Sequence, residues 1–175
     1  SGDIQTGVTV GGALSDLGVV DRTILAAKVD GAVVDLSCAL SESSILEPLR
    51  FDSAEGREVY RHSSTHLMAQ AVKELFPSAQ LTIGPALEDS FYYDFAFERP
   101  FTPEDLQRIE ERAAEIIKRN LTITRREFSK QDAIDFFRAR GEQYKVELIQ
   151  GFPDGEPITA YTQGDFVDLC RGPHL

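Results

Sequence analysis

The spacing of hydrophobic and polar positions changes near residue 50. Before it, short alternating runs predict strands over residues 23–29 and 32–36, joined by Asp30-Gly31, a pair typical of a type I′ hairpin turn. One helical turn is expected over residues 14–17. After residue 50, runs with helical spacing alternate with short strand-like runs. The pattern predicts an α+β protein with a mostly antiparallel sheet and helices on one face of it.

Three helices are predicted in the second part. The first follows Ser53, a candidate N-cap, and ends at Pro77, because proline lacks the N–H that continues a helix. The second begins at Thr102-Pro103, a capping residue followed by proline at the first helical position. A third helix is expected from Ser129 to Gly141. The second helix is expected to bury one apolar face, which consists of Leu106, Ile109, Ala113, Ile116 and Ile117.

Strand-like runs separate and follow these helices. They cover residues 80–83, 90–97, 121–128, 144–149, 158–161 and 166–169. The change of pattern divides the chain into a small module over residues 1–50 and a larger domain over residues 51–175.

Composition narrows the classes of protein. The chain has 175 residues and a net charge of −11, so its overall charge does not favour binding to nucleic acid. The local basic pairs that could contact RNA are Lys118-Arg119 and Arg125-Arg126. Two cysteines are too few for a disulfide framework, which indicates a reducing, cytoplasmic setting. No apolar run is long enough for a membrane span, and the first residues do not resemble a signal peptide. Opening on Ser1 rather than methionine indicates a processed or excised piece.

The three histidines fall into two tight pairs. His62 and His66 are four residues apart on the predicted first helix and therefore share a face. Cys170 and His174 enclose Gly-Pro, which places them on a turn. Three imidazoles and one thiol are the donor set of a tetrahedral zinc site, but a histidine could equally act as a general base on water. Chance spacing is the alternative, and the sequence does not say whether the pairs meet.

Five collinear motifs carry a family resemblance. They are Arg61-His-Ser-Ser-Thr-His-Leu67, Ile83-Gly-Pro85, Phe91-Tyr-Tyr-Asp94, Gly141-Glu-Gln-Tyr-Lys-Val146 and Val167-Asp-Leu-Cys-Arg-Gly-Pro-His174. Together they resemble the N-terminal region of threonyl-tRNA synthetases over nearly the whole chain. The resemblance implies a β-grasp, ubiquitin-like TGS module over residues 1–50. It implies an α/β-sandwich editing domain over residues 51–175, truncated at its C-terminal end and lacking the aminoacylation core.

The resemblance implies a hydrolytic reaction. Editing domains of this family remove serine wrongly attached to threonine tRNA. Serine lacks one methyl group of threonine, and one methyl group supplies only about 1–3 kcal/mol of discrimination, so a second site is needed that admits only the smaller residue. The implied partner is the mischarged 3′ end of threonine tRNA. The piece is expected to be a cytoplasmic monomer, whereas the full-length protein is expected to be a homodimer.

Roles follow from the resemblance residue by residue. One of His62 and His66 is the candidate base, and Cys170 and His174 close the opposite wall of the pocket. Lys145 is the candidate cation beside the ester, although an ordinary lysine on a strand surface is the alternative.

Four further residues are implied as substrate-binding groups. Asp168 would bind the substrate ammonium or exclude the threonine methyl group, and Arg171 would contact the substrate. Tyr92 or Tyr93 would contact the terminal adenosine. One of these two tyrosines must point into the core, because neighbours on a strand face opposite sides.

Two other functions remain open at this point. A non-catalytic tRNA-binding or regulatory module of the same fold would have no need of the four His and Cys residues. A structural zinc domain would use His62, His66, Cys170 and His174 as ligands and would lose its fold on chelation. The family reaction itself implies no required cofactor.

Overall fold

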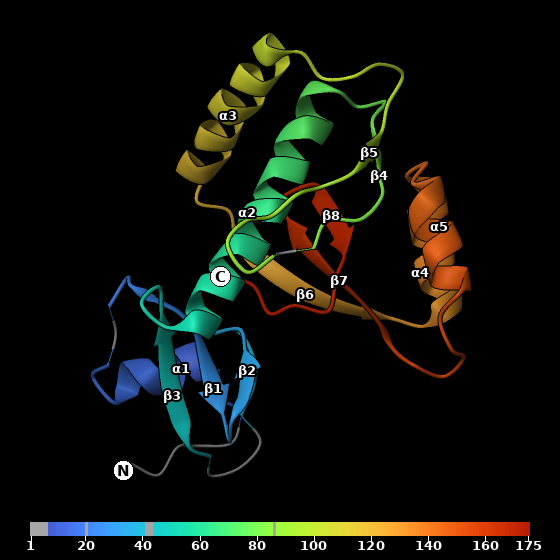
Figure 1. Cartoon of the computed structure of the whole chain (residues 1–175). Coiled ribbons are helices and arrows are strands. Elements are labelled where there is room, and N and C mark those ends of the chain that lie inside the picture. The colour runs from blue at the N-terminus through green and yellow to red at the C-terminus, as the bar shows by residue number, and fades with distance from the viewer. Residues whose placement is uncertain (1–6, 20, 41–43, 86) are drawn as a thin grey trace. The chain divides into compact units, whose positions relative to one another are not determined.

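A computed structural model describes residues 7–19, 21–40, 44–85 and 87–175. Within these residues the chain forms five helices and three antiparallel sheets, which confirms the α+β class (Figure 1). Contacts divide it into one unit of residues 1–63 with 172–175 and a second unit of residues 64–171. Helix α2 (Ala54–Leu75) runs through both units. None of the described helices combines the length and the apolar character needed to cross a bilayer.

The first unit contains a sheet of three strands in the order β2-β1-β3. These are β1 (Ile24–Val29), β2 (Ala32–Val34) and β3 (Leu46–Arg50). Asp30 and Gly31 have φ angles of 50° and 89°, which confirms the predicted type I′ turn between β1 and β2. Helix α1 (Val10–Asp16) begins earlier than the predicted single turn, because the Thr9 side chain accepts the Gly12 N–H and caps it.

The beginning of α2 is fixed within the first unit. The Ser53 hydroxyl accepts the Gly56 N–H at 3.0 Å, which confirms Ser53 as the N-cap. A Cβ on Gly56 would lie 1.9 Å from the Arg50 carbonyl oxygen, so the close approach of β3 requires glycine here. One turn further, Val59 packs into a small core with Ala26 and Leu49.

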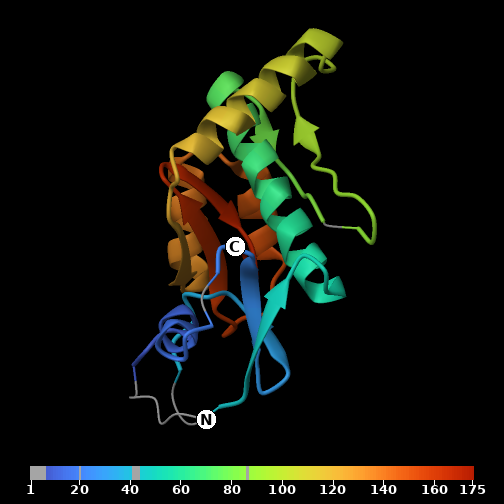
Figure 2. The same ribbon diagram turned by 90° about the vertical axis from the view of Figure 1, so that its left-hand side faces the viewer.

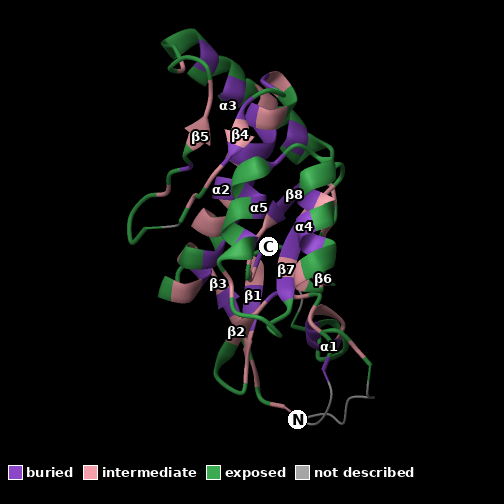
Figure 3. Ribbon diagram, turned by 90° about the vertical axis from the view of Figure 1, so that its right-hand side faces the viewer, coloured by how far each residue is buried: buried purple, intermediate pink, exposed green. Residues whose placement is uncertain are grey.

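The second unit is built on an antiparallel sheet of β6 (Ile123–Phe128), β7 (Ile158–Gln163) and β8 (Phe166–Leu169). Helices α4 (Lys130–Ala139) and α5 (Gln143–Gln150) lie side by side and share a core with β7 and β8 (Figure 1). Residues of β7 and β8 in this core are coloured as buried in Figure 3. The core residues are Ala133, Ile134, Phe137, Val146, Ile149, Ile158, Ala160 and Val167.

The other face of this sheet is also covered. Phe166 of β8 packs with Ala69 of α2 and with Tyr93, so helices cover both faces rather than the single face predicted. Helix α3 (Pro103–Lys118) packs beside the second half of α2 through Ile109 and Ile116 (Figure 2). A two-stranded ribbon of β4 (Gln80–Leu81) and β5 (Phe95–Ala96) completes the unit.

Three further sequence predictions were wrong. Residues 144–149 form helix α5 instead of a strand, because the buried positions are Lys145, Val146 and Ile149, a helical spacing. The run 90–97 was too long, since only Phe95 and Ala96 pair as a strand. Leu106 and Ile117 of α3 are exposed, because they lie at the margin of the stripe that buries Ile109 and Ile116.

Candidate functional site

The alternation of β8 decides where its one acid points. Phe166 packs towards α2, whereas Val167 packs into the core under α4 and α5. Asp168 follows Phe166 by two residues and therefore shares its face. It is 1% exposed, so the sheet holds a carboxylate in the interior.

The Asp168 carboxylate is bound on both oxygens. Lys145 Nζ lies 2.6 Å from Oδ1, and the Leu169 N–H donates to the same oxygen at 2.7 Å. The Tyr93 hydroxyl donates to Oδ2 at 2.6 Å. A carboxylate has about four acceptor positions, so one on Oδ2 is left when the described residues are counted. The buried charge is thus paired and almost fully hydrogen-bonded.

Lys145 uses all three of its ammonium protons inside the protein. Its Nζ contacts Asp168 and donates to the Thr82 carbonyl oxygen at 2.9 Å and to the Tyr93 hydroxyl at 3.0 Å. The residue is 3% exposed and lies on helix α5, not on the strand surface considered as its alternative setting. An ammonium has three donors, so a ligand would have to displace one of these partners.

Tyr93 connects the two charges. It accepts from Lys145 and donates to Asp168, and burial, followed by the nearby Asp168 charge, raises the pKa of Tyr93 well above its ordinary value. It therefore stays a neutral phenol. Its neighbour Tyr92 is exposed, which confirms that only one of the two tyrosines points into the core.

His66 lies beside this group of charges. Its Nε2 is 3.8 Å from Asp168 Oδ2, and its ring and the Phe166 ring are nearly perpendicular, with centroids 6.2 Å apart. The distance allows an ion pair when the imidazole is protonated. We call Lys145, Asp168, Tyr93 and His66 the Asp168 cluster.

A second group of side chains lies in the first unit. The rings of His62 and His174 have centroids 4.3 Å apart and are tilted by 33°. The Ser63 hydroxyl lies 3.1 Å from His174 Nδ1, and it accepts the Leu175 N–H at 3.1 Å. His174 is buried. These contacts fix the imidazole ring of His174 against helix α2.

A cavity of about 180 Å³ lies beside His62 in the first unit. It is lined by Val33, Glu55, Glu58, Val59, His62, Gly172 and Pro173. Glu55 is held by Lys28, whose Nζ lies 2.7 Å away. His62 therefore has open space on one side and His174 on another.

The donor set of the two histidine pairs fits a metal ion. His62 and His66 lie one turn apart on helix α2, as predicted. Cys170 is held to β7 by two hydrogen bonds with Thr159, of 2.6 and 3.0 Å. His62 and His174 in the first unit and His66 and Cys170 in the second offer three nitrogens and one sulfur, the donor types that a zinc ion takes.

The remaining predicted residues lie at the surface. Arg171 is exposed. Arg119 is bound by the Glu74 carboxylate through two bonds of 2.8 Å, and Arg125 lies 2.6 Å from Glu127. These two arginines therefore already have acidic partners.

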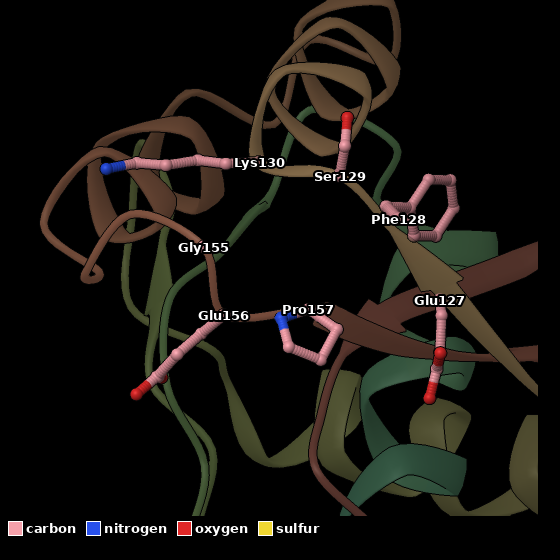
Figure 4. A pocket seen from close by; sticks show the side chains of 7 residues that line it. All are labelled: Glu127, Phe128, Ser129, Lys130, Gly155, Glu156 and Pro157. Carbon is pink, nitrogen blue, oxygen red and sulfur yellow. The ribbon is translucent and has the colours of Figure 1, made fainter.

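A larger hollow of about 510 Å³ lies where β6 meets α4. Figure 4 shows Ser129 and Phe128 on one side of it and Gly155 and Glu156 on the other. Its one cation, Lys130, is bound by Asp154 at 2.7 Å and by the Phe152 carbonyl oxygen. None of the predicted site residues lines it.

Sequence reasoning missed several supporting residues. Ser63 stands between the two helix histidines, and its place in that motif was the available signal. Glu142 lies 2.7 Å from Lys73 and accepts the Leu81 N–H, so it ties α2 and β4 to the start of α5. Thr82 contributes only a backbone carbonyl to Lys145, which no sequence pattern marks.

Comparison with known proteins identifies the family, although no family model matches the chain. It is 52% identical to a threonine–tRNA ligase of Symbiobacterium thermophilum over 170 residues, which are 97% of this chain and 26% of that protein. Those of Aromatoleum aromaticum and Acidithiobacillus ferrooxidans are 49% and 51% identical, over 96% and 97% of the chain. In each case the chain spans about a quarter of the relative's length. The chain therefore belongs to the threonine–tRNA ligase family, as the part corresponding to that quarter.

Proposed function

We propose that this chain hydrolyses the ester that joins serine to the 3′ end of threonine tRNA. The observation that carries the proposal is the Asp168 cluster, in which a buried carboxylate, ammonium and phenol are held beside an imidazole. Groups of this kind, buried in fixed positions, are typical of sites that bind polar substrates and move protons. The family joins threonine to tRNA, and serine that is attached in its place by mistake would have to be removed.

The proposed reaction is the addition of water to the ester carbonyl carbon. The bond between that carbon and the ribose oxygen then breaks, and serine and free tRNA are released. A water proton passes to His62 or His66 as general base and returns to the departing ribose oxygen. No covalent enzyme intermediate is required.

The Asp168 cluster would select the substrate by size. Three of its members, Lys145, Asp168 and Tyr93, are each held by at least two hydrogen bonds, so they form a wall that yields little to an added methyl group. The remaining acceptor position on Asp168 Oδ2 would take the serine ammonium. Because Lys145 has no free proton, it would act through the position and charge of Asp168 instead of touching the ester.

We propose further that both histidine pairs face one substrate. Support comes from one contact within each unit. His66 lies beside Asp168, and His62 lies beside His174. Cys170 lies between Asp168 and His174 in the sequence. Arg171 and the exposed Tyr92 would contact the terminal nucleotides of the tRNA.

The wider expectations follow the same proposal. Residues 1–50 would be the TGS module and residues 51–175 the editing domain. The partner would be mischarged threonine tRNA in the cytoplasm. The chain would act as a monomer, while the longer protein dimerises through a synthetase core. The reaction would need no metal, although the His and Cys donor set also favours zinc binding as a second function.

The test is hydrolysis of seryl- and threonyl-threonine tRNA by the chain. We expect loss of serine alone, abolished in a His62→Ala/His66→Ala variant whose circular dichroism matches the parent chain. Arg138→Ala, an exposed arginine of α4, is the control for substitution itself. Equal loss of both amino acids, or activity that survives in the double variant, would contradict the proposal.

A further inference from the structure

Ser63 is buried between two groups of the C-terminal segment. It is 7% exposed, and its Oγ lies 3.1 Å from His174 Nδ1 and 3.1 Å from the Leu175 nitrogen. Among the described residues, the Ser63 hydroxyl has hydrogen-bond contacts with these two nitrogens alone. The direction of each bond can therefore be worked out.

The Leu175 N–H can only donate, so Ser63 Oγ accepts that bond. The hydroxyl proton then has a single acceptor in reach, the lone pair of His174 Nδ1. If Nδ1 carried a proton instead, two donors would point at Oγ and the hydroxyl proton would be buried without a partner. A buried unpaired polar group is costly, so the arrangement favours a bare Nδ1. A neutral imidazole with a bare Nδ1 carries its proton on Nε2.

We propose that Ser63 is a positioning residue that holds His174 as the neutral tautomer protonated on Nε2. His174 then offers its Nε2–H as a hydrogen-bond donor. Neither ring nitrogen has a lone pair available, because Nε2 carries the proton and Nδ1 accepts the Ser63 hydroxyl. It is neither the base that accepts a proton from water nor a metal ligand in this state. The base must come from His62 or His66. In the proposed editing reaction, on which this step rests, the Nε2–H would donate to an oxygen of the ester.

The chain has only three histidines, so the NMR signals of His174 can be resolved and its tautomer identified directly. We would label the chain with ¹⁵N-histidine and record two-bond ¹H–¹⁵N correlations at about pH 8, where ordinary histidines are neutral. In the wild-type chain His174 should show a protonated Nε2 and a bare Nδ1. A protonated Nδ1 on His174 would overturn the proposal without any variant.

Variants then test the cause. Ser63→Ala should convert His174 to a mixture of tautomers, whereas Ser63→Thr, which keeps the hydroxyl, should retain the Nε2–H form. Ser64→Ala makes the same change at the next position of α2 and should leave His174 unaltered. An unchanged tautomer in a folded Ser63→Ala chain would contradict the role of Ser63.

Hydrolysis is measured separately on the same proteins. Ser63→Ala should lower kcat for seryl-threonine tRNA by about 10-fold or more, with recovery in Ser63→Thr. A wild-type chain in which His174 is the Nε2–H tautomer but no hydrolysis occurs would count against the proposed function. The role of Ser63 in positioning His174 would still stand. A shifted tautomer with unchanged kcat would overturn the catalytic part of this inference.

Discussion

Lys145 Nζ and the Asp168 carboxylate meet at 2.6 Å, and both side chains are almost wholly buried. Burying two charges costs solvation energy that their attraction offsets only when the geometry and the further hydrogen bonds are good. Here Tyr93, Thr82 and the Leu169 N–H supply those bonds. The pair is therefore better explained by the need for a fixed charge in the interior than by a gain in stability.

The first prediction concerns this ion pair. Lys145→Met should lower the free energy of unfolding by about 3–5 kcal/mol, because it leaves the buried Asp168 charge without its cation. Urea unfolding measures the change. Lys130→Met is the control, because its partner Asp154 is 93% exposed and such a pair contributes about 1 kcal/mol or less. Equal losses in the two variants would show that burial of the first pair has no energetic consequence.

Adding Asp168→Leu to Lys145→Met extends the same test. Removing both charges should restore part of the stability lost in Lys145→Met, because no unpaired charge remains. Hydrolysis of seryl-threonine tRNA should be absent in the double variant. A double variant that is less stable than the two single losses combined would contradict this account.

A second prediction concerns the glycine behind Tyr93. A Cβ on Gly84 would lie 2.4 Å from Tyr93 Cδ2, so Gly84→Ala must displace the ring whose hydroxyl donates to Asp168. We expect a loss of about 1–3 kcal/mol in stability, as for other overpacked sites, and weaker discrimination of serine from threonine. Gly151→Ala is the matched control, because its nearest neighbour is 3.4 Å away. Similar behaviour of the two variants in urea unfolding and in hydrolysis would be the contrary result.

The third prediction is a pH dependence at the start of α3. Hydrogen bonds from Arg99 and from the Thr102 backbone lower the pKa of Asp105 well below its ordinary 3.8. A carboxyl group with a lowered folded pKa contributes stability above its unfolded pKa and loses that contribution as the pH falls towards the folded pKa. The stability difference between the wild type and Asp105→Asn should therefore be constant above about pH 5 and shrink below about pH 4. Urea unfolding across that range measures it, and a difference that grows at low pH would be inconsistent with a lowered pKa.

The fourth prediction concerns metal. Dialysis against a chelator should leave hydrolysis of seryl-threonine tRNA unchanged, because the proposed chemistry uses imidazole bases. If zinc is required, chelation should abolish hydrolysis and added Zn²⁺ should restore it, and Cys170→Ser should weaken that recovery. Metal content measured by mass spectrometry after each step separates the two results. A loss of helical signal on chelation would instead favour the structural zinc domain.

Much of the local structure could be predicted from the sequence. Asp30-Gly31 has the φ angles that a type I′ turn requires, and Ser53, Thr102 and Ser129 cap the helices that follow them. The spacing of His62 and His66 on α2 was also readable. These features depend on φ and ψ preferences and on neighbours within one turn, so a short stretch of sequence contains their cause.

The site depended on contacts that no local rule contains. Tyr93 and Asp168 are 75 positions apart, and Ser63 and His174 are 111 apart. The strand predicted over 144–149 became helix α5, and only that helix brings the ammonium of Lys145 to the interior.

The turns, the helix caps and the residue types available for chemistry follow from short stretches of the sequence. The tertiary structure decided which of them meet, because the packing of β8 between α2 and the α4–α5 layer sets the face on which Asp168 lies. A shift of β8 by one residue would turn Asp168 away from His66 and Tyr93, since neighbours on a strand point to opposite faces.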